Sequence, residues 1–471
     1  MNKVNNMLVE LLLIFLTLCA YLVWKVRGRG RYWADHGVAH LGMDYLGGSE
    51  GMVDVILKRK HILDLMREHY HKFSEEKIYG IYSITKPVLV IRDPDIVRQI
   101  FVKDFNSFTD RDPAKRLDKT FGKTRDVDTY WKNQLTSLNG TKWKDVRATF
   151  SPVFTSGKMK LMMKFIQAIS EKLVKEFDKA AENDKDVELK EVFGKFSMDT
   201  IASCAFGVDA ESFDNEDSQL VKNAAKIFTF SLLDGLKIIG VAMIPGLDKV
   251  YEFFNINVMK PKETGFFVDV IRKTIKRRRE SDERRNDLID LMLDAMSEEN
   301  DKPGADTEDV DQYERDMKLN HVSGIKAFDE KTIVSTAMIL FAAGYDTTAL
   351  TLAFASHELS KNPDIQERLQ NEVDEAYELA NGKCPDYNVI QNLPYLDQVI
   401  HETLRMHPVF NMTRTCVVPE YKVPGTNYTI KKDERININV SGIHSDPKFY
   451  PNPEQFNPEN FSKEAKSSRS P

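Results

Sequence analysis

The most continuous apolar run in the chain lies between Lys331 and Leu359, and it is apolar on nearly every helical face. A helix with no polar side is typical of the core of a large domain or of a membrane span. At about 1.5 Å per residue, the run predicts a helix roughly 40 Å long. Its middle is interrupted by residues 343–348, AGYDTT. Because a buried carboxylate is costly unless it is paired or hydrogen-bonded, the interruption indicates a functional site.

A second apolar run extends from Met7 to Trp24 and is broken by Glu10 and Thr17. Its length is sufficient to cross a thin bilayer. Basic residues follow it at positions 25, 27, 29 and 31, so the positive-inside rule places the rest of the chain in the cytosol. We expect residues 1–26 to be an uncleaved membrane anchor. The alternative is a cleaved secretory signal, in which the basic residues precede the apolar run.

The cytosolic topology makes a prediction about N-glycosylation. The chain contains sequons at Asn139, Asn411, Asn427, Asn439 and Asn460. These would carry no glycan in the cytosol, and a glycan on any of them would overturn the topology.

The remaining pattern predicts many helices and few strands. Alternation over 78–84 and 88–92 predicts two strands, followed by a helix with Asp93 as N-cap and Pro94 as its first residue. Periodicity predicts further helices over 159–179, 189–206, 362–379 and 396–406. A β-hairpin is predicted over 421–440. We therefore expect a mainly α fold with small β-sheets.

Several segments lack such a regular pattern. Residues 105–139 predict a long polar connection, and residues 297–331 predict an acid-rich surface loop. The apolar, interrupted stretch 224–251 is compatible with core, with a substrate lid or with a contact to the membrane surface. The charge run Lys276–Arg285 favours a solvated helix face.

Composition and charge narrow the class of protein. A hydrophobic fraction of 42% and a charged fraction of 29% are typical of a folded protein, and the net charge of -6 indicates no nucleic-acid partner. The cysteines are far apart and form no CxxC pair; they are Cys19, Cys204, Cys384 and Cys416. This spacing argues against a disulfide scaffold or a zinc site and is typical of a reducing compartment.

Two short motifs have helical spacing. Trp143 and Arg147 lie four apart in a helix predicted to begin near Thr141, so they share one face. Glu402 and Arg405 lie three apart and also share a face. Taken alone, the first pair is more often a packed indole beneath a long side chain, and the second an ordinary surface ion pair.

In this order and at these distances, the features resemble a membrane-bound eukaryotic cytochrome P450. The set consists of the N-terminal apolar run, WKDVR at 143–147, AGYDTT at 343–348, ETLR at 402–405 and NPEQFNPENF at 452–461. The sequence IASCAFG at 201–207 is similar to insect microsomal detoxifying members. The resemblance covers roughly residues 78–461 and implies the cytochrome P450 fold, with residues 27–471 forming a haem-thiolate monooxygenase domain.

The resemblance implies a haem b cofactor and residues that hold it. Trp143, Arg147 and Arg414 resemble residues that grip the haem propionates, and Arg111 is a weaker match. Cations suit this task because two carboxylates must be neutralised at the edge of an apolar cavity.

The resemblance also implies roles on both sides of the haem. Asp346 and Thr347 match the acid and the alcohol that lie above the iron and deliver protons to oxygen. Gly344 would leave room for oxygen and let the helix open locally as a π-bulge. Glu402 and Arg405 would form a buried ion pair that supports the coil on the haem side.

Three features depart from the family pattern. The Pro-rich hinge after the anchor is missing, since the first proline is Pro87. Asn460 stands where the family usually has an arginine that joins the ion pair, so we expect a weaker network. The loop Phe-x-x-Gly-x-x-x-Cys-x-Gly, whose thiolate binds the iron, is expected beyond Pro471, and none of the four cysteines replaces it. No metal ligand is therefore assigned within the chain.

The activity implied is that of a haem-thiolate monooxygenase of the endoplasmic reticulum membrane, with its catalytic domain facing the cytosol. It would insert one atom of O2 into an apolar small molecule, xenobiotic or lipid-like. Its electrons would come from NADPH through a membrane-bound reductase, which could dock on the basic residues near 142–160. The substrate lining is expected from residues 105–139, 224–251 and 409–412.

Two alternatives stay open at this point. The chain could be a truncated, haem-free or catalytically dead membrane protein of the same family. It could also be a redox-neutral haem-thiolate isomerase or dehydratase, which the presence of Asp346 and Thr347 disfavours.

Overall fold

The computed structural model describes residues 30–44, 48–83, 86–111, 126–290 and 329–468, apart from isolated positions between 216 and 286 and residue 410. It also describes Leu293 and single residues between 10 and 28. The predicted anchor at 1–26 and the predicted loop at 297–331 lie largely outside these residues.

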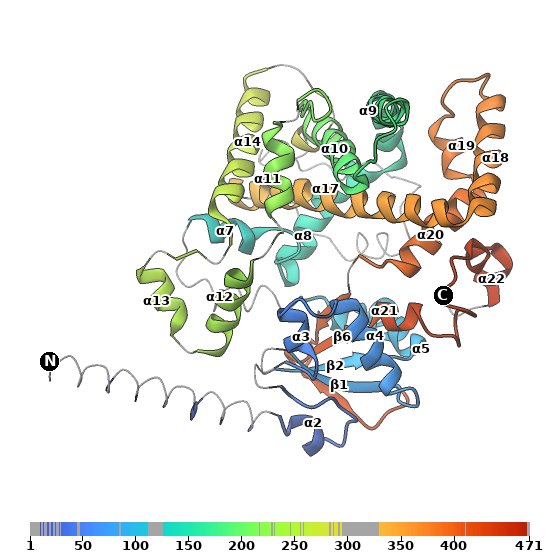
Figure 1. Cartoon of the computed structure of the whole chain (residues 1–471). Helices are drawn as coiled ribbons and strands as arrows, with labels where there is room; N and C mark the ends of the chain where they lie inside the picture. Colours follow the sequence, from blue (N-terminus) through green and yellow to red (C-terminus); the bar gives the residue numbers. More distant parts are fainter. Residues whose placement is uncertain are drawn as a thin grey trace.

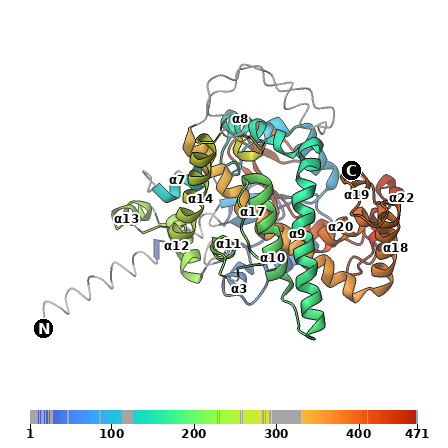
Figure 2. The same ribbon diagram turned by 90° about the horizontal axis from the view of Figure 1, so that it is seen from above.

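A long helix, α17 (Glu330–Lys361), crosses the helical part of the molecule (Figure 1). On one side of it lie α9 (Ser156–Glu182), α10 (Leu189–Ile201), α11 (Gln219–Ile227) and α14 (Pro261–Arg279), and a β-sheet lies on the other. Seen from above, α18 (Pro363–Leu379), α19 (Tyr387–Gln391), α20 (Pro394–Met406) and α22 (Lys463–Ser468) group at one end (Figure 2). The prediction of a mainly α fold with small sheets is confirmed.

The short elements fill the space between these parts. They are α2 (Tyr32–Asp35), α3 (Met52–Ile56), α4 (Ile62–Lys72), α5 (Pro94–Arg98), α7 (Asp126–Asn133), α8 (Gly140–Phe150), α12 (Leu232–Met243), α13 (Leu247–Phe253) and α21 (Val440–His444). Single turns of 3-10 helix occur at Phe105–Ser107, Ser151–Phe154 and Pro458–Phe461, and π-helical turns at Gln99–Lys103 and Ala202–Phe206. The predicted start of α5 is confirmed, because the Asp93 carboxylate accepts from two of its backbone N–H groups ahead of Pro94.

The helix α17 forms where the apolar run predicts it. The Asp329 side chain caps its first turn by accepting from the Thr332 N–H, and the helix ends before Pro363. Phe341 stacks on Phe206 with ring centroids 3.7 Å apart, in the largest apolar core of the described residues. Within those residues α17 is the one helix long and apolar enough to cross a membrane, and its contacts with α10, α14 and α7 place it in the core.

The main sheet joins parts of the chain that are far apart in sequence. Its strand order is β1 (Ile78–Ser83), β2 (Lys86–Ile91), β6 (Arg435–Ile438) and β3 (Met412–Thr415), with only β2 and β6 parallel. The hairpin predicted over 421–440 is only half right. Strands β4 (Glu420–Lys422) and β5 (Thr429–Lys431) pair with each other, whereas β6 leaves them to pair between β2 and β3.

The prediction of a polar connection over 105–139 is wrong for its second half. Residues 126–133 form α7, in which Tyr130 and Trp131 are buried in the core around α17. The indole of Trp131 also donates to the Thr264 hydroxyl at 3.0 Å. The two aromatic side chains therefore override the polar composition of their surroundings.

The prediction of a solvated face at Lys276–Arg285 is wrong for Arg278. Its guanidinium is only 9% exposed and pairs with Asp287 at 3.0 Å and with Asp290 at 2.8 Å. The sequence of 276–285 favoured exposure because the acidic residues that neutralise Arg278 lie after this run in the chain. The chain folds back and brings them next to Arg278.

Of the three alternatives for residues 224–251, core applies to the first part of that stretch alone. Ala224 and Ile227 belong to the core, through α11. The next two helices instead carry an apolar surface patch, the α12–α13 patch, whose members are Leu233, Leu236, Val250, Phe253 and Phe254. Phe253 is 83% exposed and Phe254 is 64% exposed, so this patch is not core.

Candidate active site

The polar centre of α17 presents Thr347 on one side of the helix. The Thr347 hydroxyl donates to the Ala343 carbonyl at 2.8 Å, one turn earlier. Ala343, Thr347, Leu350 and Phe354 follow the helical spacing of one face, and each is at least partly exposed. We call this stripe the uncovered face; Asp346 and Thr348 beside it are also solvent-accessible.

The predicted π-bulge at Gly344 is wrong, since α17 is α-helical from end to end. A Cβ atom at Gly344 would lie 3.2 Å from Cγ1 of Ile201, on the π-helical turn side of α10. The glycine therefore makes room for the packing of α10, and not for a ligand on the uncovered face.

Asp346 points away from Thr347 and toward α10. Its carboxylate lies 3.2 Å from the Lys190 ammonium, and about a third of its side chain is exposed. Tyr345 is buried beside it, and its phenol lines a polar cavity of about 370 Å³ together with Lys190. Burial raises the pKa of the Tyr345 phenol, and the charges of Asp346 and Glu191 raise it further. The phenol therefore stays neutral at physiological pH.

A second group of predicted site residues meets around Phe105. The Phe105 ring lies 6.0 Å from the ring of Trp143, and the guanidinium carbon of Arg414 lies 5.6 Å from the Phe105 ring centre. Phe105 thus places the indole from α8 beside the guanidinium from β3. Arg147 follows Trp143 by one turn of α8.

Arg111 reaches the same region through backbone contacts. The Arg111 N–H donates to the Asn139 side chain at 3.1 Å, and the Gly140 N–H donates to the Asp110 carboxylate at 2.9 Å. The Thr415 N–H donates to the Asp110 carbonyl at 2.9 Å, next to Arg414. The start of α8, residues 110–111 and β3 therefore lie close together. We call Arg111, Trp143, Arg147 and Arg414 the basic corner.

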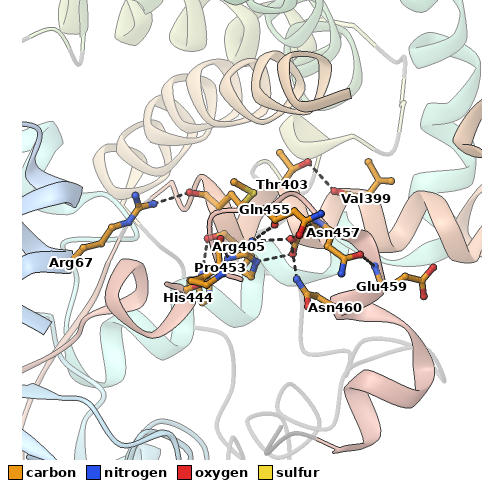
Figure 3. Close-up of polar contacts among 12 residues, drawn as sticks. Arg67, Val399, Thr403, Arg405, His444, Pro453, Gln455, Asn457, Glu459 and Asn460 are labelled. Atoms are coloured by element: carbon orange, nitrogen blue, oxygen red, sulfur yellow. Dashed lines mark hydrogen bonds and ion pairs between the residues drawn. The ribbon is translucent and has the colours of Figure 1, made fainter. Parts of the chain in front are cut away.

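Glu402 and Arg405 form a bidentate ion pair inside the protein. Nε of Arg405 lies 2.7 Å from one Glu402 oxygen and Nη2 lies 2.8 Å from the other, with both side chains at most 1% exposed. Arg405 also donates to the carbonyls of His444, Pro453 and Gln455 (Figure 3). One side chain on α20 thus holds the end of α21 and the irregular coil that follows.

Asn460 belongs to this network even though it is neutral. Its side-chain amide donates to Glu402 at 3.1 Å, and the Asn457 backbone N–H donates to the same oxygen at 2.9 Å (Figure 3). A neutral donor forms a weaker hydrogen bond to a carboxylate than a guanidinium does.

A cavity of about 460 Å³ lies between the end of α17, the end of α20 and α21. The His407 ring stacks on Phe354 at 4.2 Å and lies 2.9 Å from the buried carboxylate of Glu358, so it ties α20 to α17. His444 also lines the cavity. Burial lowers the pKa of His444 to about 4, and the positive charges of Arg405 and Arg67 act in the same direction.

Comparison with known proteins identifies the family. The family described as Cytochrome P450 matches residues 52–471. The chain is 33% identical to cytochrome P450 6k1 of Blattella germanica, over 97% of this chain and 83% of the relative. It is 31% identical to cytochrome P450 6B5 of Papilio glaucus, over 95% and 87%, and 33% identical to cytochrome P450 3A14 of Cavia porcellus, over 84% and 71%.

The chain belongs to the cytochrome P450 family. It is accordingly an oxidoreductase of the monooxygenase class, with the P450 fold and a haem cofactor implied by membership. Two of these relatives come from insects, in keeping with the resemblance to insect members of the family.

The described residues fit a haem in two respects. The uncovered face offers small, apolar and hydroxyl side chains, which suit a flat apolar group approached by oxygen. In the basic corner Trp143 and Arg414 both lie near Phe105, and guanidinium groups and an indole N–H are donors of the kind that suits two propionates. We treat the individual roles in this P450 as proposals below.

None of the described cysteines lines the 460 Å³ cavity. Cys204 is buried in the π-helical turn after α10, where burial raises its pKa to about 11, and burial also raises the pKa of Cys416 behind the sheet. Cys384 lies in the turn between α18 and α19.

Sequence reasoning missed the partners that α10 and α20 supply. Lys190 and His407 were not singled out, although each contacts the central helix. A signal was present for α10, because Lys190, Gly194, Ser197 and Ile201 share one face at spacings of four, three and four. Its meaning depends on knowing that α17 lies against that face.

We predict that Glu402→Ala lowers the free energy of unfolding by about 3–5 kcal/mol, because it leaves a guanidinium buried without its carboxylate. Urea denaturation of the purified protein measures this loss. The matched control is Glu459→Ala, which removes an exposed partner of Arg368 at 2.6 Å and should cost less than about 1 kcal/mol. Equal losses in the two variants would contradict the buried role.

Proposed function

We propose that this P450 inserts one atom of O2 into apolar small molecules, xenobiotic or lipid-like, with electrons from NADPH supplied by a membrane-bound reductase. The observation that carries the proposal is that Thr347 and Asp346, adjacent residues on α17, face different surroundings. The Thr347 hydroxyl lies on the uncovered face, and the next residue back, Asp346, contacts solvent and Lys190 on the other side. Such an arrangement supplies protons to one side of the helix from the other.

The cofactor we propose is haem b, held through its propionates by Trp143, Arg147, Arg414 and Arg111. When bound, the haem supplies the electron-transfer and oxygen-activating chemistry. Thr347 Oγ1 holds a proton in its hydrogen bond to the Ala343 carbonyl, and rotation of the hydroxyl presents that proton on the uncovered face. Asp346, being partly exposed, can accept a replacement proton from solvent. Glu402 and Arg405 support the coil beneath.

The second activity class retained from the sequence, a redox-neutral isomerase or dehydratase, needs no proton supply to oxygen. The placement of Thr347 on the uncovered face and of its neighbour Asp346 beside Lys190 favours the monooxygenase over it. Apolar substrates are supported by the exposed Val409 and Phe354 at the 460 Å³ cavity.

We propose that residues 1–26 anchor the protein in the endoplasmic reticulum membrane and that the catalytic domain, 27–471, faces the cytosol. Leu13, Tyr21 and Trp24 are helical, and their exposed fractions are 57%, 39% and 72%. The α12–α13 patch adds a second exposed apolar surface. Apolar side chains in such positions favour contact with lipid.

The carbon monoxide spectrum of the reduced protein tests the proposed function. We expect a haem-loaded protein that includes the iron-binding cysteine loop to show the long-wavelength absorption of a thiolate-ligated iron. With reductase, NADPH and ¹⁸O₂, an apolar ether probe should gain one labelled oxygen atom per product molecule. A reduced spectrum without the thiolate band, or a product without label, would contradict the proposal.

We predict that Thr347→Ala uncouples electron use from product formation, because the proton at its Oγ1 is lost from the uncovered face. NADPH oxidation should continue while product formed per NADPH falls by about 100-fold, the lower end of general acid–base effects. Thr351→Ala is the matched control, since that hydroxyl makes the same kind of bond, to the Thr347 carbonyl at 2.9 Å. If Thr347→Ala forms as much product per NADPH as the parent protein, the proposed role is wrong.

The structure sharpens the glycosylation test of topology to one sequon. Asn427 is exposed in the turn between β4 and β5, whereas the Asn439 amide donates to the Met66 carbonyl and the Tyr79 hydroxyl in the core. We predict no glycan on Asn427 in cells, as judged by an unchanged electrophoretic mobility after endoglycosidase treatment. A version whose residues 1–26 are replaced by a cleavable secretory signal should gain that glycan, and Asn427→Gln in that version should reduce the endoglycosidase-sensitive shift by one glycan. A glycan on the natural protein would refute the cytosolic orientation.

A further inference from the structure

One face of α10 contacts three successive residues at the polar centre of α17. Ile201 packs on Gly344, and the Ser197 hydroxyl donates to the Tyr345 carbonyl at 2.9 Å. Lys190 pairs with Asp346 at 3.2 Å. Between these contacts the phenol of Tyr345 rests directly on Gly194.

The contact between Tyr345 and Gly194 leaves no space for a side chain. A Cβ atom at position 194 would lie 2.9 Å from the Tyr345 hydroxyl oxygen and 3.0 Å from its Cε2. Tyr345 is 5% exposed and packs in the core, so a Cβ atom at position 194 would have to displace its ring toward the 370 Å³ cavity that it lines. The Tyr345 ring therefore packs directly against the backbone of Gly194.

The composition of α17 explains why this contact is needed to orient the helix. A helix rotates to bury its apolar stripe, but α17 is apolar on nearly every side ahead of its centre, so burial defines its rotation poorly. The Asp346–Lys190 pair is partly exposed on both sides and contributes little to holding an orientation. A one-residue shift in rotation moves a side chain by about 100° around the helix, enough to take Thr347 off the uncovered face.

We propose that the face of α10 formed by Lys190, Gly194, Ser197 and Ile201 is a clamp that fixes the rotation of α17, with Gly194 and Tyr345 as its positioning residues. The clamp holds Thr347 on the uncovered face and Asp346 against Lys190. The consequence for turnover rests on the proposed function, whereas the clamp itself is a property of the two helices.

Gly194→Ala tests the clamp, and Gly194→Ala combined with Tyr345→Phe tests whether it acts through the hydroxyl that Cβ would meet. The matched control is Gly265→Ala on α14, where a Cβ atom meets nothing within 4 Å. Hydrogen exchange at residues 343–348 and product formed per NADPH are measured in the full-length protein, together with KM.

In Gly194→Ala we expect exchange at 343–348 to accelerate by about tenfold, as expected for a locally overpacked contact. Product per NADPH should fall several-fold while KM and NADPH oxidation stay close to the parent values. The double variant should recover part of both losses, because it removes the 2.9 Å contact with the hydroxyl but keeps the 3.0 Å contact with Cε2, and Gly265→Ala should match the parent.

Parent-like exchange and coupling in Gly194→Ala would overturn the proposal. Acceleration spread evenly over the whole chain, with no recovery in the double variant, would also overturn it, because that is the result of general destabilisation. If exchange responds as expected while the parent protein makes no oxygenated product, the clamp stands and the proposed function fails.

Discussion

The positions of α21 and of the coil that follows it depend on the hydrogen bonds made by the buried Arg405 guanidinium. Its planar fork meets both oxygens of Glu402 and the carbonyls of His444, Pro453 and Gln455. The coil over 445–457 has no strand or helix to satisfy its backbone groups. A single fixed set of donors therefore replaces secondary structure there, and α20 determines where α21 and the coil lie.

Local features of the fold were predictable because their causes are local. The cap at Asp93, the stop before Pro363 and the length of α17 all follow from residues a few positions apart. Pairings between distant residues were not predictable in this way. Strand β6 fits either the hairpin or the main sheet by its pattern alone, and the choice depends on β2, more than 340 residues earlier. Arg278 likewise needs its folded neighbours before its burial can be known.

The site shows the same division between local and distant causes. The spacing of Glu402 and Arg405 and the hydroxyl at Thr347 could be recognised in the sequence, because helical spacing decides which residues share a face. The direction of Asp346 could not, since it depends on Lys190, and Gly344 was assigned to oxygen when its neighbour is Ile201. An almost uniformly apolar helix carries little information about its own rotation, so that information resides in α10.

The burial of Asn439 has a consequence for how the chain is made. Its amide is 1% exposed and already bonded to Met66 and Tyr79, so a sugar attached there could not be accommodated in the folded protein. Glycans are attached at surface sequons of secreted chains. A nascent chain threaded into a glycosylating compartment would expose this sequon before it folds, and modification would block the native core. A chain inserted with the opposite orientation would therefore be unable to reach this fold.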